Sequence, residues 1–260
     1  PLLFVLFGFK AYSQGLYINP MQYTPTELVE DILITGCLQA FNVTYTGDPL
    51  SKGYFETTAI PQNFPYAAGV VLSSGYALQA SGPNNSGSTT ANTSGPSDPT
   101  LNALIPQSTN DAAILEFDFI PADNIITFSY IFGSEEYLEW VNSSFNDVFA
   151  FFLTGTNPLP GPNYFNTNIA LVPGTATPVS INNVNSTANN AYYFNNGTGG
   201  TPNNEAVEFD GYTQGLTATA AVVACETYHI KLAVADAGDS AYDSAVFLEA
   251  GSLVSGEVVS

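Results

Sequence analysis

The sequence predicts an all-β protein, an antiparallel β-sandwich or jelly roll with one short N-terminal helix. Three observations support this fold class. Many short segments alternate apolar and polar residues, turn residues are abundant between them, and no helices alternate with the strands as they would in an α/β protein. The chain has 260 residues, including 22 Gly and 17 Pro. We expect residues 14–260 to form a single domain.

The helix is predicted near the N-terminus. Thr24 is a suitable N-cap, Pro25 fits the first helical position, and Glu27 completes a capping box. An apolar stripe follows, and Gly36 ends the helix.

The strands are predicted from period-two alternation and from short apolar runs bounded by turn residues. The predicted strands are residues 38–46, 66–76, 113–120, 125–132, 147–153, 169–172, 177–184, 191–194, 216–235 and 244–254.

Two long segments lack such patterns. Residues 81–100 are rich in Ser, Gly, Asn, Thr and Pro and contain almost no apolar side chains, so we expect a long, exposed and mobile loop. The stretch from Asn182 to Asn204 is rich in Asn, which favours turns, so it too is interpreted as loop.

The charge balance excludes several classes of partner. Lys and Arg total 3 against 23 Asp and Glu, which gives a formal net charge of -20. Nucleic acids and anionic lipids are bound through cationic side chains, so neither is an expected partner. Three basic residues cannot pair with the acids, and most carboxylates must be solvated, hydrogen-bonded or bound to a metal ion.

The N-terminus resembles the end of a secretory signal peptide. Residues 1–13 are apolar and end in Ala11-Tyr-Ser13, which predicts cleavage before Gln14. The alternative is a short buried strand. No other segment is long and apolar enough to span a membrane, so we expect a secreted or cell-surface protein whose mature domain is not inserted in the membrane.

The cysteine and histidine content restricts the chemistry. Cys37 and Cys225 are the only cysteines, and in an exported protein they predict a disulfide bond. His229 is the only histidine. It lies in an alternating strand pattern, so we interpret it as a strand side chain rather than a catalytic base.

The segment 232–248 carries three aspartates, Asp236, Asp239 and Asp243, in a short loop between two apolar runs. Calcium binds six to eight oxygen atoms from carboxylates, carbonyls and water. Without a cation the three charges would repel one another at close range. The loop therefore predicts a Ca²⁺ site, although its spacing differs from that of an EF-hand. The alternative is a solvated acidic turn.

A second acidic motif contains Glu135 and Glu136 after a Gly-Ser turn, and Asp147 at the start of the next strand. If the two motifs meet, they form a composite metal site with Glu135, Glu136, Asp147, Asp236, Asp239 and Asp243 as ligands. The spacing leaves open whether they meet, and two separate solvated turns are the alternative.

Aromatic residues in or near loops are candidates for ligand contacts, because ring faces stack on sugars and tyrosine is amphipathic. The candidates are Tyr137, Trp140, Tyr192, Tyr193 and Tyr212. Ordinary core or edge packing is the alternative for each.

Paired carboxylates also raise the possibility of a glycoside hydrolase, with Glu135 and either Asp147 or Glu116 as the pair. The sequence does not fix the separation that this chemistry needs, so we assign no catalytic residues and expect no enzymatic activity.

Five segments follow one another in a characteristic order: residues 112–119, 128–137, 146–153, 225–236 and 243–253. This series resembles the choice-of-anchor L domain. The resemblance covers most of residues 22–254 and implies an exported bacterial surface protein, often from Bacteroidetes and secreted by the type IX system. The chain ends at Ser260 without a recognisable anchor region, which indicates a shortened chain or the N-terminal part of a longer protein.

We therefore expect a calcium-stabilised binding or adhesion module that presents its loops to a glycan or a surface protein. The alternatives are a structural spacer or filament-forming domain, and a carbohydrate-active hydrolase. Further domains and self-association are left open.

Overall fold

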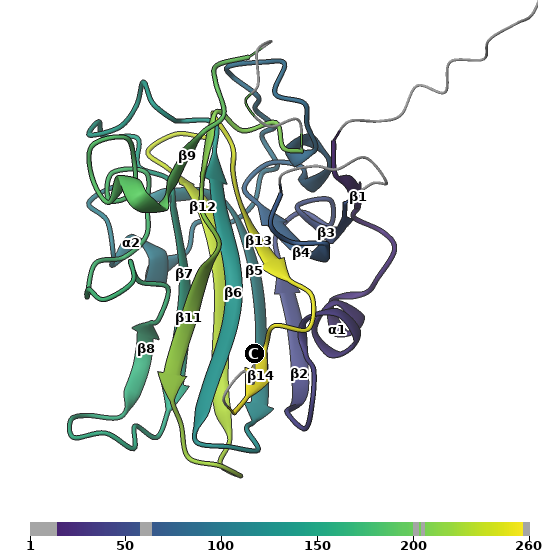
Figure 1. Cartoon of the computed structure of the whole chain (residues 1–260), viewed down its shortest axis with the longest axis vertical. Coiled ribbons are helices and arrows are strands. Elements are labelled where there is room, and N and C mark those ends of the chain that lie inside the picture. The colour runs from purple at the N-terminus through teal and green to yellow at the C-terminus, as the bar shows by residue number, and fades with distance from the viewer. Residues whose placement is uncertain (1–14, 58–63, 200–202, 204–205, 257–260) are drawn as a thin grey trace, which may run out of the picture.

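A computed structural model describes residues 15–57, 64–199, 203 and 206–256. Fourteen strands form two antiparallel sheets that pack face to face as a sandwich (Figure 1). This confirms the all-β fold class. The predicted signal peptide, residues 1–13, lies outside the described residues.

The larger sheet has the strand order β1-β3-β4-β13-β6-β10-β9, and β11 and β14 also pair with β6. Its strands are β1 (Tyr17–Asn19), β3 (Lys52–Glu56), β4 (Ala68–Ser73), β6 (Ile125–Ser134), β9 (Tyr193–Asn195), β10 (Gly211–Thr213), β11 (Leu216–Ala221), β13 (Ser244–Glu249) and β14 (Val254–Ser255).

The smaller sheet has the order β2-β5-β12-β7-β8. Its strands are β2 (Gln39–Thr46), β5 (Thr109–Ile120), β7 (Val148–Gly155), β8 (Tyr164–Asn168) and β12 (Tyr228–Ala237). Its two edge strands, β2 and β8, each contain an irregularity in pairing, and each has an Asn with positive φ there, Asn42 at 54° and Asn166 at 46°.

The main core lies between the two sheets and is rich in aromatic rings. Period-two alternation in β7 directs Phe149 and Phe151 into this core and Ala150 and Phe152 to the outer face. The ring of Phe151 packs edge-on against Tyr130 of β6, with 4.9 Å between ring centroids. The core therefore depends on the same alternation that predicted the strands.

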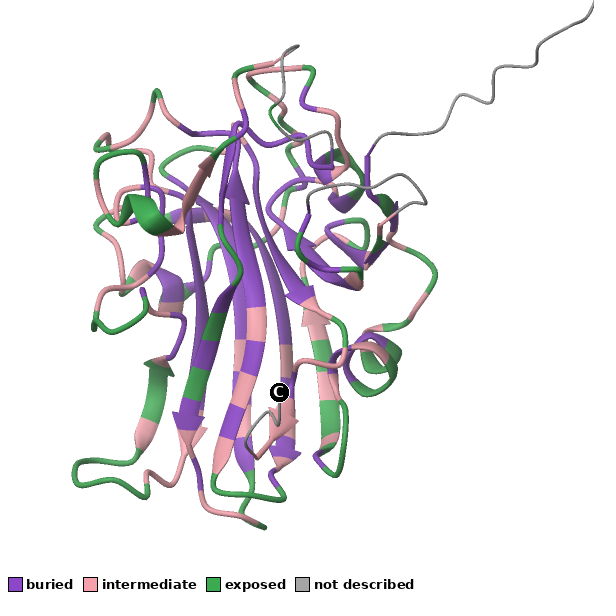
Figure 2. Ribbon diagram, in the orientation of Figure 1, coloured by how far each residue is buried: buried purple, intermediate pink, exposed green. Residues whose placement is uncertain are grey.

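Both sheets are covered on their outer faces at one end, which is uppermost in Figure 1. On the larger sheet, Phe55 and Phe64 pack on Phe247. On the smaller sheet, a segment that contains α2 (Pro99–Asn102) places Leu101 in a cluster with Ile114. Figure 2 shows the strands mostly buried in the upper half, with buried and exposed residues alternating lower down. The upper end is therefore the part of the sandwich from which water is most excluded.

The N-terminal helical turn begins as predicted. Thr24 caps α1 (Pro25–Glu27) in a reciprocal capping box with Glu27. The chain continues as a wider turn, η1 (Leu28–Leu33), and Gly36, with φ of +80°, follows its end. Two further short helical turns are η2 (Ala77–Ala80) and η3 (Asn190–Tyr192).

Three sequence predictions are corrected by the structure. Cys37 and Cys225 are exposed, free thiols, so the predicted disulfide is absent. The predicted strands 169–172 and 177–184 are reduced to isolated bridges. The loop 81–100 is not fully exposed, because Asn84, Thr93 and Asp98 are buried within it.

Phe149→Ala should lower the free energy of unfolding by about 3–5 kcal/mol, because it leaves a cavity between the sheets. Phe165, whose surface is 80% exposed, is the matched control, and Phe165→Ala should cost about 0.5 kcal/mol or less. Urea unfolding of the two variants and the parent measures both values. Equal losses for the two variants would contradict the assignment of the core.

Candidate functional site

Acidic side chains gather at the upper end of the sandwich. Strands β6 and β12 end there, and β7 and β13 begin there, so antiparallel order brings their flanking residues together. Five of the six predicted metal ligands are buried at this end: Glu135, Glu136, Asp147, Asp236 and Asp243. The two acidic motifs therefore meet, a point that the spacing in the sequence left open.

Four of these acids form an inner group, Glu136, Asp147, Asp236 and Asp243. Asp147 Oδ1 accepts a hydrogen bond from the Ala237 amide at 3.0 Å, and Oδ2 accepts one from the Ser244 hydroxyl at 2.7 Å. The Asp147 amide in turn donates to Glu136 Oε2 at 3.2 Å. Asp147 lies at the start of β7 in the smaller sheet and Ser244 opens β13 in the larger sheet, so this carboxylate joins the two sheets.

Asp236 is the least satisfied member of the inner group. It is fully buried, and neither of its carboxylate oxygens makes a hydrogen bond of regular geometry, although the Ser74 hydroxyl and the Asp147 carboxyl lie close enough to act on it. Asp147 and Asp243 are near enough for their charges to act on it. A buried carboxylate in this state needs a proton or a cation.

Glu135 points into a second group, which it forms with Glu208 and Asp210. Glu135 Oε1 accepts from the Thr89 amide at 2.9 Å. Asp210 Oδ1 accepts from Asn84 Nδ2 at 2.6 Å. Sequence reasoning missed Glu208 and Asp210. The signal that could have found them is their alternation around Phe209, which is buried in an apolar cluster.

The loop 84–95 covers both groups with its backbone amides. Asn85 and Ser86 donate to Glu208, and the Ala91 amide donates to Asp243 at 2.9 Å. The Gly95 amide donates to Asp111 at 2.8 Å. These bonds show that the predicted loop is not fully exposed, because several of its backbone amides are tied to buried acids.

Close packing around the inner group depends on a glycine. A Cβ atom added to Gly75 would lie 1.7 Å from Asp243 Oδ2. The Asp243 carboxylate therefore occupies the space that a side chain at position 75 would need.

Burial raises the pKa of these acids. It is the largest cause at Glu135, whose pKa rises to about 8, at Asp243, with a pKa of about 7, and at Asp210, with a pKa of about 6. Burial also raises the pKa of Glu136, Asp147 and Asp236, and neighbouring carboxylate charges raise the pKa of Glu136 and Asp236 further. In the absence of a cation, the inner group is thus substantially protonated at neutral pH.

The donor atoms suit a hard cation, since they are carboxylate and hydroxyl oxygens. Within the described parts of the chain, however, no three or more Asp, Glu, His or Cys side chains are arranged to hold a metal ion. The sixth predicted ligand, Asp239, is exposed, and its side chain accepts from the Ala241 amide. Cation binding would therefore require carboxylates of the inner group to turn toward one point.

The predicted ligand-binding aromatics separate into two sets. Tyr137 and Tyr212 are buried, which makes their rings unavailable to a ligand and corrects the prediction for both. Tertiary contacts hold both rings in place. The Tyr137 hydroxyl donates to the Val184 carbonyl at 2.7 Å, and the Tyr212 ring stacks on Phe194.

The other three candidates, Trp140, Tyr192 and Tyr193, are only partly buried. Trp140 packs edge-on against Phe145 and Tyr242, with ring centroids 5.2 and 5.8 Å apart. Tyr242 belongs to the loop 236–243, which we call the aspartate loop. The three rings therefore form an aromatic group beside the inner acids.

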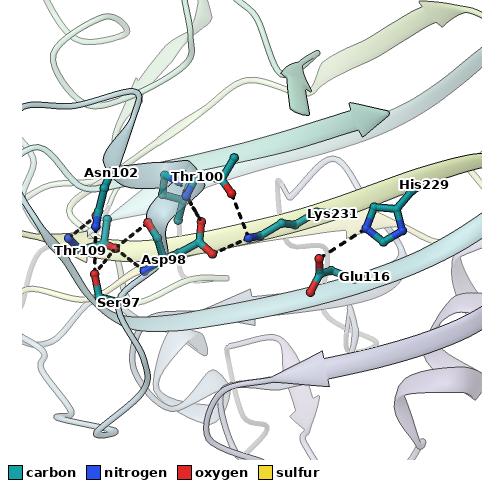
Figure 3. Close-up of polar contacts among 9 residues, drawn as sticks. Ser97, Asp98, Thr100, Asn102, Thr109, Glu116, His229 and Lys231 are labelled. Carbon is teal, nitrogen blue, oxygen red and sulfur yellow. Dashed lines mark hydrogen bonds and ion pairs between the residues drawn. The ribbon is translucent and has the colours of Figure 1, made fainter. Parts of the chain in front are cut away.

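Glu116 lies apart from this site. It is on the outer face of the smaller sheet, where its Oε1 is 3.4 Å from His229 Nε2 (Figure 3). The other ring nitrogen of His229 is 2.9 Å from Asp118 Oδ1. Glu116 and Glu135 therefore do not form the carboxylate pair that a glycoside hydrolase would need.

The family model of the choice-of-anchor L domain matches residues 17–254. The chain belongs to this family. No curated protein and no solved structure matches it. Choice-of-anchor L membership makes the protein an extracellular, surface-associated module. Among the described residues, no helix is both long enough and apolar enough to cross a membrane.

The free energy of unfolding of this choice-of-anchor L domain, measured in EDTA, should fall as the pH rises from 4.5 to about 8. In this window the unfolded chain has lost protons that the folded acids retain, so the folded state binds more protons and raising the pH favours unfolding. The slope should be about 1.4 kcal/mol per pH unit for each acid that differs in protonation.

Urea unfolding at a series of pH values measures this slope. Asp236→Asn should reduce it, because asparagine has no proton to lose. Asp31→Asn, at an exposed position, is the control and should leave it unchanged. A slope that is the same in all three proteins would contradict the role of the inner group.

Proposed function

We propose that this choice-of-anchor L domain is a secreted or cell-surface binding and adhesion module of a bacterium, with calcium stabilising its acidic upper end. The proposal rests on one observation. The inner acids converge beneath surface loops, and Asp236 is fully buried there with no hydrogen bond of regular geometry to either oxygen. The family also favours a Bacteroidetes protein exported by the type IX system.

Neither lysine in the described part of the chain supplies the counter-charge for the inner group. Lys231 contacts Asp98, and Lys52 donates to the Pro20 carbonyl. Neither of these described lysines reaches the inner acids. At low pH, bound protons neutralise the inner carboxylates. When these acids ionise, a divalent cation is the remaining source of positive charge.

Calcium fits this role better than magnesium. Calcium accepts six to eight oxygens in flexible geometry, whereas magnesium demands a near-octahedral shell and retains its water. A group of crowded carboxylates with hydroxyls and amides around it offers variable geometry. Once bound, the ion would hold β6, β7, β12 and β13 together at the upper end.

A rigid upper end can present a ligand-binding surface. The inner acids lie between the loop 84–95, the loop 135–147 and the aspartate loop. The aromatic group of Trp140, Phe145 and Tyr242 joins the last two loops. Its partly exposed rings beside polar loops suit a glycan or a surface protein as ligand.

Calcium at about 100 times its Kd should raise the melting temperature by about 5–10 °C relative to EDTA, because a ligand bound only to the folded state stabilises it by about 2.7 kcal/mol. The shift should grow from pH 5 to pH 8, since calcium must displace protons. Asp147→Asn should abolish the shift, and Asp31→Asn should retain it. Identical melting temperatures in calcium and EDTA would refute calcium binding.

Binding to a glycan array in the presence of calcium should be lost or reduced at least tenfold in Trp140→Ala. This change removes the ring through which the loop 135–147 contacts Tyr242 of the aspartate loop. Phe165→Ala, which removes an exposed ring on β8, is the matched control and should bind like the parent. If a protein stabilised by calcium bound no glycan and no surface protein and instead assembled into filaments, the adhesion function would be wrong and a structural function would replace it.

A further inference from the structure

A partly buried lysine and a buried aspartate meet on the outer face of the smaller sheet. Lys231 is in the middle of β12, and its Nζ contacts Asp98 Oδ2, with 12% and 4% of the two side chains exposed. Asp98 belongs to the segment that crosses this face and contains α2. Figure 3 shows the Lys231 side chain extended along the sheet toward Asp98 and Thr100.

The surroundings of Lys231 supply one carboxylate and an apolar wall. In the register of the sheet, Glu116 of β5 is directly opposite Lys231 on one side, and the buried Phe152 of β7 is opposite on the other. Leu101 and Ala233 extend the apolar wall toward the upper end. Water is therefore largely excluded from the Lys231–Asp98 contact.

The two oxygens of Asp98 have different partners. Oδ1 accepts hydrogen bonds from the Thr100 and Leu101 amides, at 3.0 and 2.8 Å, while Oδ2 faces the lysine. Two amides on one oxygen polarise the carboxyl group and would stabilise negative charge that develops on Oδ1. The carboxyl carbon of Asp98 is thereby activated toward the amine beside it.

We propose that Lys231 and Asp98 condense to form an intramolecular amide, an isopeptide bond between Nζ and the carboxyl carbon. A proton first passes from the Lys231 ammonium to Asp98 Oδ2, which gives a neutral amine and a neutral acid. The amine attacks the carboxyl carbon, and the negative charge is placed on Oδ1. A second amine proton moves to the hydroxyl at Oδ2, the oxygen that Nζ contacts. The C–Oδ2 bond breaks, one water leaves, and no oxidant or cofactor is consumed.

Glu116 is close to Lys231 in the sheet, but its carboxylate contacts His229, and no ion pair among the described residues joins it to the lysine. It is the cross-strand neighbour of Lys231, and in Figure 3 it lies between Lys231 and His229. His229 Nε2, 3.4 Å from Glu116 Oε1, fixes the carboxylate from the other side. Asp118 is the cross-strand partner of His229 and contacts the opposite nitrogen of its ring.

The product fits the same geometry as the ion pair. Oδ1 becomes the amide oxygen and keeps both backbone hydrogen bonds. The new amide N–H replaces the ammonium near the Thr100 hydroxyl, which is 3.4 Å from Nζ. The bond would join the crossing segment covalently to the central strand of the smaller sheet.

Mass spectrometry of the folded, purified chain, denatured for measurement, should give the sequence mass less one water. Lys231→Arg keeps the positive charge but has no nucleophilic amine, and it should have its full sequence mass. Asp98→Ala has no carboxyl carbon to attack and should also have its full sequence mass, and Asp118→Asn, on the same face, should link like the parent. A folded parent with its full sequence mass would overturn the proposal.

Trypsin gives a second readout after denaturation. The chain has lysine at positions 10, 52 and 231 and no arginine. An amide at Lys231 blocks cleavage there, so residues 53–260 should remain one fragment. The Lys231→Arg variant should be cut after position 231. The same cut in the parent would overturn the proposal independently of the mass.

Discussion

The burial of carboxylates at the upper end of the sandwich is the constraint on which the rest of the structure depends. Asp147 accepts hydrogen bonds from Ala237 in one sheet and from Ser244 in the other, so a single side chain fixes how the sheets meet. The loop 84–95 lies over this end because its amides pair with the acids. A group that is costly to bury thereby orders a segment that has no apolar side chains of its own.

The cost of that burial makes the upper end responsive to its surroundings. Acids whose pKa is raised to about 7 or 8 change charge close to neutral pH. Under the proposed function, divalent cations would compete with protons for the same oxygens, and the stability of this end would depend on both. The lower half of the sandwich, held by aromatic packing, does not share this dependence. The domain thus combines an apolar core with one end whose charge depends on pH.

Features set by local sequence were predicted well. The capping box at Thr24 and the strands around Phe119, Tyr130 and Phe149 follow from patterns within a few residues. The meeting of Asp147 with Asp236 required the order of strands in two sheets, which no local pattern contains. The segment 84–95 is the loop that was predicted, but its buried contacts were missed because partners such as Glu135 and Asp243 are 46 and 152 residues away in the chain. Tyr137 and Tyr212 were predicted wrongly because nearby turn residues suggested exposure, whereas tertiary packing buries both rings.

The irregular edge strands of the smaller sheet bear on how many copies of this domain can stand close together. Strands β2 and β8 each depart from regular pairing near a left-handed asparagine, Asn42 or Asn166. Such bulges twist an edge and interrupt the row of amides and carbonyls that another chain could extend. If identical copies stand side by side, two regular edges could join into a continuous sheet. The bulges at the two asparagines therefore keep neighbouring copies separate, because they hinder pairing between the edge strands of adjacent domains.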